Sequence, residues 1–230
     1  MNYSAMQKAT FLSRPNRFIA HCQVEGREVI AHVKNTGRCK ELLLPGVTVW
    51  LEHHRNSSRK TQWSLIAVEK GERLINMDSQ APNRIAEEAI LNGTLTLPGW
   101  EQPDKVRREV RYGDSRFDLC LEKDGKRAFV EVKGVTLEED GAVYFPDAPT
   151  QRGLKHVREL CSALEEECGA FILFVIQMEN VRFFAPNDST HAAFGEALRE
   201  AEKKGVQIVA ADCFVAPEEV RLRSIVPVQL

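Results

Sequence analysis

Short segments of alternating apolar and polar residues dominate the first 80 positions of the chain. Turn signals such as Glu25-Gly26 and Pro45-Gly46 separate them. The pattern predicts strands at Arg17–Val24, Glu28–Val33, Val47–Glu52, Trp63–Val68 and Arg73–Met77. Short strands at regular spacing are typical of a small β-barrel. We expect a five-stranded barrel of the oligonucleotide-binding (OB) type, with other small barrels as the alternative.

From residue 81 onward, apolar positions recur at helical spacing between fully apolar strands. A boundary falls near Ser79–Pro82, and Asn83 is expected to cap the helix that follows. The pattern predicts helices at Asn83–Ile90, Thr150–Glu167 and Ala192–Lys204 and strands at Val106–Tyr112, Ala170–Ile176 and Val206–Ala211. We therefore predict an α+β protein of two domains, an OB-like barrel over residues 1–80 and an α/β domain with a mixed sheet over residues 81–230.

An acidic β-hairpin is predicted inside the second domain. The runs Ser115–Glu122 and Arg127–Lys133 flank Asp124-Gly125, a strong signal for a tight turn. A loop centred on that turn pairs Asp118 with Glu131 and places Lys133 two residues further along the same face. Two carboxylates would then lie about 5 Å apart, an arrangement that destabilises a sheet unless a cation compensates it.

The residue types of this hairpin suit a divalent metal site. Carboxylate oxygens on neighbouring strands favour Mg²⁺ or Mn²⁺, and Lys133 would add a positive charge beside the ion. Such a site can support hydrolysis of a phosphodiester bond. The alternative is an ordinary amphipathic hairpin with Asp118 and Glu131 on its solvated face.

Charge differs between the two predicted domains although the net charge is only −2. Residues 1–80 hold 12 Lys and Arg against 7 Asp and Glu, whereas residues 81–230 hold 19 against 26. A basic barrel is typical of nucleic-acid binding, with a solvated basic surface as the alternative. The candidate contacts are Arg14, Arg17, Lys34, Arg38, Lys40, Arg55, Arg59 and Lys60.

Two further predictions concern the turn Asn35–Arg38 and the cysteines. Gly37 would permit a tight turn that exposes backbone N–H groups to a phosphate, or Asn35 would simply stabilise a turn between strands. The six cysteines are scattered without zinc-site spacing, and no apolar run approaches the length of a membrane span. We expect a cytoplasmic protein with reduced thiols and no membrane contact.

The order of helix, three strands carrying Asp and then Glu-x-Lys, helix and strand resembles the core of the PD-(D/E)xK nuclease superfamily. The whole chain resembles a narrower group, the sugar fermentation stimulation protein A family. Six segments carry that resemblance: Lys34–Arg38, Pro82–Ala89, Arg107–Val110, Glu131–Lys133, Phe145–Thr150 and Arg152–His156.

The resemblance implies catalytic roles for Asp118, Glu131 and Lys133, with Phe117 standing where the superfamily name has proline. It also implies a carboxylate from the first helix, Glu87 or Glu88, of which we favour Glu88. Arg152 and His156 lie four residues apart on one helical face and would reach a scissile phosphate, unless Glu159 pairs with them instead.

Two functions follow from these features. The first is a DNA-binding protein with little sequence preference, linked by the resemblance to regulation of maltose metabolism. The alternative is a Mg²⁺- or Mn²⁺-dependent nuclease acting through Asp118, Glu131 and Lys133. Single-stranded DNA and RNA both stay open as partners, and the sequence does not define the oligomeric state.

Overall fold

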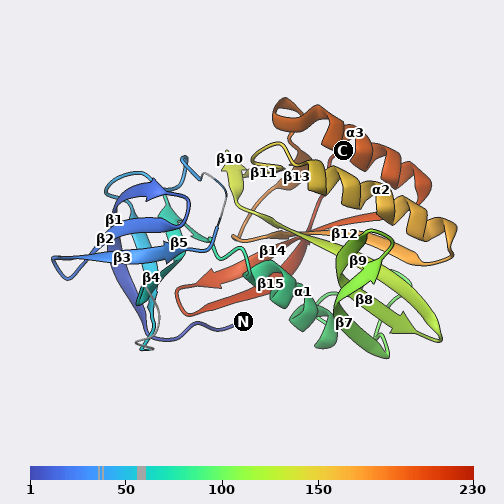
Figure 1. Cartoon of the computed structure of the whole chain (residues 1–230), viewed down its shortest axis with the longest axis horizontal. Coiled ribbons are helices and arrows are strands. Elements are labelled where there is room, and N and C mark those ends of the chain that lie inside the picture. The colour runs from blue at the N-terminus through green and yellow to red at the C-terminus, as the bar shows by residue number, and fades with distance from the viewer. Residues whose placement is uncertain (36, 38, 56–60) are drawn as a thin grey trace.

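The computed structural model describes residues 1–35, 37, 39–55 and 61–230, which form two lobes side by side (Figure 1). The first lobe is a β-barrel built from β1 (Met6–Asn16), β2 (Ile19–Val24), β3 (Arg27–Val33), β4 (Thr48–His53) and β5 (Trp63–Lys70). The sheet order is β3-β2-β1-β4-β5, and a parallel pairing of β3 with β5 closes the barrel. β6 (Arg73–Asn76) extends β5 as a hairpin. The predicted OB barrel is confirmed.

One strand of the barrel escaped the sequence prediction. The five predicted strands correspond to β2–β6, whereas the closed barrel uses β1 in place of β6. Only Ala9 and Phe11 of β1 are fully buried, and the strand contains Pro15. Its alternation is therefore weak, and its pairing with β2 and β4 defines it instead.

The second lobe is an α/β domain around a six-stranded sheet of order β15-β14-β12-β9-β8-β7. Its strands are β7 (Lys105–Tyr112), β8 (Ser115–Lys123), β9 (Lys126–Val135), β12 (Gly169–Ile176), β14 (Gln207–Ala216) and β15 (Glu219–Val226). β9, β12 and β14 run parallel, while β7, β8 and β15 are antiparallel to their neighbours. The predicted mixed sheet is confirmed.

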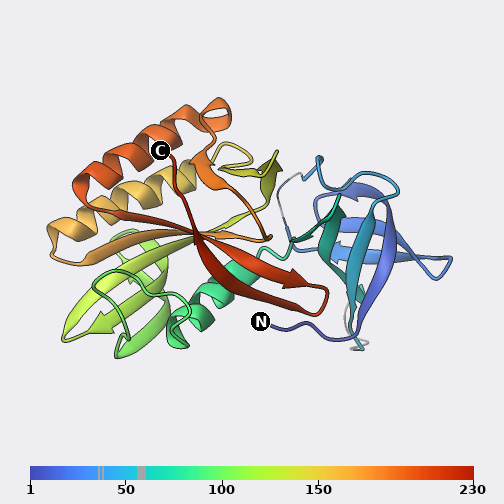
Figure 2. The same cartoon turned by 180° about the vertical axis from the view of Figure 1, so that it is seen from behind.

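Helices cover both faces of this sheet (Figures 1 and 2). α1 (Ala81–Leu91) packs on one face, and α2 (Gln151–Glu165) and α3 (Asp188–Lys204) pack on the other. A small sheet of β10 (Leu137–Glu139), β11 (Ala142–Phe145) and β13 (Phe183–Pro186) lies beside them. The sheet is thus buried on two sides, which explains why its central strand β12 is apolar throughout.

The first helix begins earlier than predicted. Gln80 occupies its N-cap and Pro82 lies in its first turn, so Asn83 is inside the helix and does not cap it. Pro82 explains the shift, because the first turn of a helix tolerates a residue that lacks an N–H group. Asn83 is free to use its side chain elsewhere.

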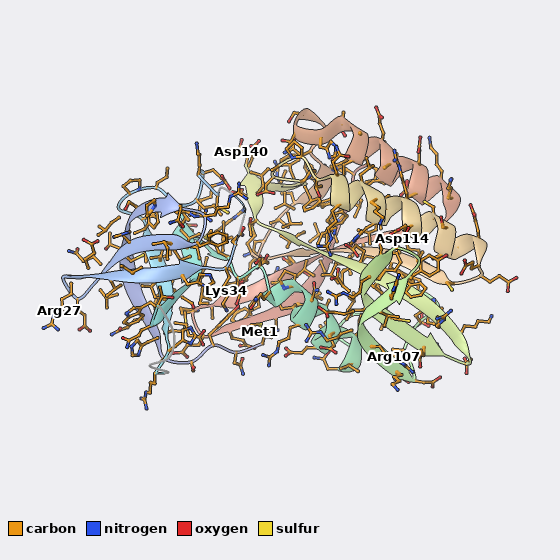
Figure 3. All side chains as sticks on the ribbon, in the orientation of Figure 1. Met1, Arg27, Lys34, Arg107, Asp114 and Asp140 are labelled. Carbon is orange, nitrogen blue, oxygen red and sulfur yellow. The ribbon has the colours of Figure 1, made fainter. Side chains whose placement is uncertain are left out.

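The two lobes are joined by more than the link between β6 and α1. Residues near the N-terminus cross to the second lobe, where Asn2 pairs with Glu219 and the Tyr3 N–H donates to the Glu218 carbonyl. A buried network at the junction includes Asp78, whose carboxylate accepts from Lys34 at 2.6 Å. Figure 3 shows Lys34 between the two lobes. Such contacts fix the barrel against the α/β domain. Among the described residues no helix is both long and apolar enough to cross a membrane.

Candidate metal centre and cationic surfaces

The acidic hairpin forms with the predicted register. β8 and β9 pair from Lys123↔Lys126 to Leu119↔Val130, and Asp118 and Glu131 follow directly beyond the last of these pairs. At that point the Asp118 side chain takes the place of a backbone carbonyl in the strand pairing, because its Oδ2 accepts a hydrogen bond from the Val132 N–H at 2.8 Å. Its Oδ1 accepts from the Asn83 amide of α1 at 2.7 Å. β9 and α1 together hold this carboxylate in place.

Glu131 is only 3% exposed and uses one carboxylate oxygen for two partners. Its Oε1 accepts from Lys133 Nζ and from His156 Nδ1 of α2. Its Oε2 is buried without a hydrogen-bond partner among the described residues. A buried carboxylate oxygen without a partner is costly, so this atom is a candidate ligand for a bound group.

The two carboxyl groups differ in their affinity for protons. Burial and the nearby Glu131 charge raise the pKa of Asp118 above its ordinary value, despite the opposing effects of Val132, Lys133 and Asn83. Burial alone would raise the pKa of Glu131 as well, but the contacts with His156 and Lys133 outweigh it and lower that pKa. Glu131 is thus favoured as a carboxylate, and a cation near Asp118 would favour its ionised form too.

The donor set fits a hard divalent cation with an incomplete protein shell. It offers carboxylate oxygens, the ligand type that Mg²⁺ and Mn²⁺ prefer. No cluster of three or more His, Cys, Asp or Glu residues suited to a metal occurs in the described parts of the chain. Waters or substrate oxygens would have to complete the shell, as is common for Mg²⁺.

The helix residue that reaches this site is Asn83, and the prediction of Glu88 is not supported by its contacts. Glu88 forms ion pairs with the Met1 amino group at 2.7 Å and with Arg84 at 2.8 Å. Glu87 lies 3.8 Å from Arg108. Pro82 is the signal in the sequence that places Asn83 inside the helix and not at its cap, because proline favours the first turn of a helix.

A cationic pocket lies on the α2 side of Glu131. Its volume is about 420 Å³, and it is lined by Arg111, Asp114, Ser115, Arg116, Arg152, Lys155 and His156. Arg152 Nε donates to His156 Nε2 at 3.5 Å, so Arg152, His156 and Glu131 form a chain. The alternative partner Glu159 pairs with Lys155 instead, at 3.6 Å. The sequence analysis missed Arg111 and Arg116, which β7 and β8 bring to α2.

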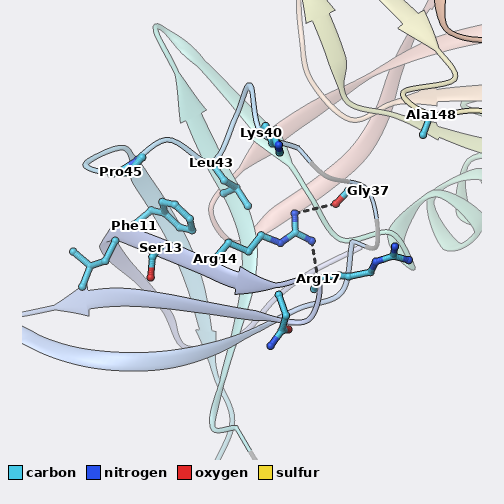
Figure 4. Close-up of a pocket in the computed structure, with 11 residues that line it drawn as sticks. Phe11, Ser13, Arg14, Arg17, Gly37, Lys40, Leu43, Pro45 and Ala148 are labelled. Carbon is cyan, nitrogen blue, oxygen red and sulfur yellow. Dashed lines mark hydrogen bonds between the residues drawn. The ribbon is translucent and has the colours of Figure 1, made fainter.

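Three of the predicted barrel cations line a second pocket of about 650 Å³, shown in Figure 4. They are Arg14, Arg17 and Lys40. The Arg14 guanidinium donates to the carbonyl groups of Gly37 and Asn35 at 2.9 and 2.7 Å, so it also supports the loop after β3. The pocket closes against Ala148 of the α/β domain.

The remaining predicted contacts have three outcomes. The contacts of Lys34 do not support its prediction, because its ammonium group is held in the ion pair with the fully buried Asp78 and the side chain is only 17% exposed. Arg55 is exposed beyond the end of β4. Arg38, Arg59 and Lys60 lie outside the described residues. Of the two predictions for the turn at Gly37, the structure supports stabilisation by Asn35, because the Gly37 N–H donates to Asn35 Oδ1 at 2.8 Å.

This protein is of the class in which an OB barrel is fused to a mixed-sheet α/β domain. The α/β domain carries a cluster of two carboxylates and a lysine. Family models agree with both halves: residues 12–77 match the SfsA N-terminal OB domain, and residues 80–219 match the sugar fermentation stimulation protein RE domain. The chain belongs to the sugar fermentation stimulation protein family.

Relatives of this family align along the whole chain. Proteins named sugar fermentation stimulation protein homolog from Desulfitobacterium hafniense and Clostridium beijerinckii are each 49% identical over 230 residues, covering 100% of this chain and 99% and 100% of theirs. The structure of Pyrococcus furiosus SfsA in complex with Ca²⁺ matches with a TM-score of 0.89 and 29% identity, covering 100% of this chain and 98% of that one.

Proposed function

We propose that this protein binds nucleic acid and hydrolyses its phosphodiester bonds with the help of a divalent cation held by Asp118 and Glu131. The observation that carries the proposal is the buried Oε2 atom of Glu131, which has no partner in the described part of the chain. Glu131 lies on a strand next to the half-buried Asp118 and contacts Lys133, the residue pattern of the PD-(D/E)xK nucleases.

A related structure supports the metal. The P. furiosus relative is described as a complex with Ca²⁺, a cation that takes oxygen ligands as Mg²⁺ does. When bound, Mg²⁺ or Mn²⁺ would polarise a phosphoryl oxygen and lower the pKa of a coordinated water. Asp118 and Glu131 would be its protein ligands here.

The neighbouring side chains have distinct roles in this proposal. Lys133 would hold a water or neutralise charge that develops at the scissile phosphate. His156 donates to Glu131 and fixes the orientation of its carboxylate, as Asn83 does for Asp118. Both are positioning residues, because they act through the carboxylates.

Cations in two pockets would bind the phosphate backbone. Arg111, Arg116 and Arg152 line the pocket beside His156, and Arg14, Arg17 and Lys40 line the pocket on the barrel. Phosphate contacts of this kind give salt-dependent binding with little sequence preference. DNA is the expected partner, and cytoplasmic residence with six free thiols is part of the proposal.

A DNA-binding protein without catalytic activity, linked to regulation of maltose metabolism, is the second candidate. One contact favours it: Lys133 is paired with Glu131, so a positive charge already neutralises that carboxylate. A metal would have to share Glu131 with this lysine. The two candidates use the same binding surfaces and differ only in cleavage.

Cleavage of labelled single-stranded, duplex and branched DNA with Mg²⁺ or Mn²⁺ separates these candidates. The wild type should cleave at least one substrate, and Asp118→Asn and Lys133→Met variants that keep DNA binding should not. Binding without cleavage by the wild type under both metals would reject the nuclease and leave the regulator.

A further inference from the structure

A third pocket lies between the two lobes, directly beside the candidate metal centre. It has a volume of about 180 Å³ and is lined from both domains. The barrel side contributes Asn35, Gly37 and Ser79, and the α/β domain contributes Gly134, Tyr144 and Gln177 among others. Two lining residues are sequence neighbours of the metal-centre residues. Gly134 follows Lys133, which contacts Glu131, and Pro82 precedes Asn83, which contacts Asp118, so the pocket adjoins that centre.

The position of this pocket in the sheet is that of a ligand site. β9 ends at Val135 and β12 ends at Ile176, and the pocket is lined by Val135 and by Gln177, which follows β12. These strands are parallel, and helices α1 and α2 cover opposite faces beside them. In open α/β sheets ligands bind at the carboxyl ends of such strands. Here the barrel covers that edge.

The lining combines an aromatic ring with polar groups. Tyr144 and Phe145 are half-buried neighbours in β11, so their side chains lie on opposite faces of the strand. Phe145 packs on the core rings of Phe174 and Phe194 at centroid distances of 5.6 and 5.3 Å, whereas the Tyr144 ring meets Phe183 edge-on at 6.5 Å and is the aromatic candidate for the pocket. Thr136 and Asp147 supply polar groups to the same space. Aromatic faces with polar groups around them are how proteins bind an unpaired base.

Close backbone approach shapes the floor of the pocket. A Cβ on Gly134 would lie 2.7 Å from both Gln177 Oε1 and Pro82 Cγ. The Gln177 amide nitrogen donates to Asn76 Oδ1 and to the Asp78 carbonyl, which holds the side chain in one orientation. The floor is therefore built from rigid parts of both domains rather than from surface side chains.

We propose that this interdomain pocket binds the base of one unpaired nucleotide, so that the barrel completes the site at which the strand is held beside Asp118 and Glu131. The inference rests on the proposed function and narrows its substrate to nucleic acid with a single-stranded segment. The pocket is smaller than the 300 Å³ or more of a drug-sized ligand site, which suits a single base. Asp147 in the lining disfavours a phosphate there.

The two cationic pockets fit this arrangement. The barrel pocket and the interdomain pocket both include Gly37 in their lining, so they adjoin at that residue. The other cationic pocket includes His156, which contacts Glu131. Phosphates next to the bound nucleotide would thus have cations of both domains available.

The test compares how tightly the full chain binds a labelled oligothymidylate and a labelled blunt duplex of equal length. Binding is measured by fluorescence anisotropy without divalent metal. The wild type should prefer the single strand. Tyr144→Leu should weaken single-strand binding by about fivefold or more and leave duplex binding unchanged, because a stacked base is lost. Tyr144→Phe is the matched control, since it keeps the ring and should bind like the wild type.

Thr136→Val provides a second variant that preserves shape, and it should weaken single-strand binding by roughly threefold. Single-strand binding by folded Tyr144→Leu and Thr136→Val equal to that of the wild type would overturn the proposal.

The outcome is separable from that of the nuclease proposal. Dependence of single-strand binding on Tyr144 without any cleavage would support the pocket and reject the nuclease. Cleavage that requires Asp118, together with binding that ignores Tyr144 and Thr136, would reject the pocket and support the nuclease.

Discussion

Two buried glutamates, Glu131 in β9 and Glu138 in β10, have similar surroundings but different hydrogen bonding. Both are less than 7% exposed, and both contact two side chains that can carry positive charge. Glu138 receives Lys70 on Oε2 and Arg73 and the Gly141 N–H on Oε1, so both of its oxygens are used. Glu131 receives both partners on Oε1, and its Oε2 has none among the described residues.

In the proposed function this difference separates a structural carboxylate, Glu138, from a metal ligand, Glu131. Glu138 links the barrel strands β5 and β6 to the α/β domain, and its full set of partners stabilises that junction. Glu131 keeps a buried oxygen available at the end of a strand pairing, next to Asp118. Burial and charge pairing alone do not distinguish the two; the individual oxygen atoms do.

The largest expected effect is the loss of cleavage in Glu131→Gln. Replacing a charged ligand by an amide should lower the cleavage rate by about 10²–10³-fold, the size seen when one electrostatic group of an active site is removed. Stability should fall as well, by about 2–3 kcal/mol, because Lys133 loses its carboxylate partner. Cleavage rates and urea denaturation check both values, and Glu138→Gln is the control that should keep full activity once folded.

A loss of stability without a loss of cleavage is expected in Glu138→Gln. The variant leaves Lys70 and Arg73 without their carboxylate at the domain junction, and we expect a loss of about 2–3 kcal/mol in the free energy of unfolding. The value lies below that of a fully buried pair because the two cations are 35% and 28% exposed. Urea denaturation measures it, and a stability equal to that of the wild type would remove the structural role assigned to Glu138.

A smaller effect on activity is expected for His156→Ala. His156 does not contact substrate in the proposal but orients Glu131, and loss of such a supporting residue costs about 10–100-fold in metal affinity or activity. The readout is the Mn²⁺ concentration needed for half-maximal cleavage, which should rise. His21→Ala, in the barrel and paired with Glu28, should leave it unchanged. An unaltered metal requirement in His156→Ala would contradict the positioning role.

The smallest effect concerns pH and Glu138. Burial alone would raise the pKa of this carboxyl, but Lys70, the Gly141 N–H and Arg73 outweigh it and lower the pKa below its ordinary value of 4.5. Its contribution to stability is present above that ordinary value and is lost as the pH falls through the lowered folded-state pKa. Melting temperature measured from neutral to acidic pH should fall less for Glu138→Gln than for the wild type. Parallel curves would contradict this.

Local patterns predicted part of this molecule well. Asp124-Gly125 sets the hairpin register, because a tight turn with both residues at positive φ fixes the pairing of its strands. β1 was missed because few of its side chains are buried. The long apolar strands β12 and β14 were found because a sheet covered on both faces leaves few polar positions.

Tertiary contacts decided the rest of the site. Asn83, Arg111 and Arg116 reach it from α1, β7 and β8, and no short motif shows that these elements converge. Lys34 was assigned to nucleic acid because it lies among other cations, but the junction between the domains pairs it with Asp78. The hydrogen bonding of Glu131 depends on α2, because His156 of that helix contacts Oε1 and not Oε2. This helix begins 20 residues later in the chain.

The most direct test of the central claim is a calorimetric titration of Mn²⁺ into the protein without nucleic acid. We predict that the wild type and Glu138→Gln bind the cation with equal affinity and that Glu131→Gln loses this binding. Equal Mn²⁺ binding by folded Glu131→Gln and wild type would contradict the claim that the unpartnered oxygen of Glu131 is a metal ligand.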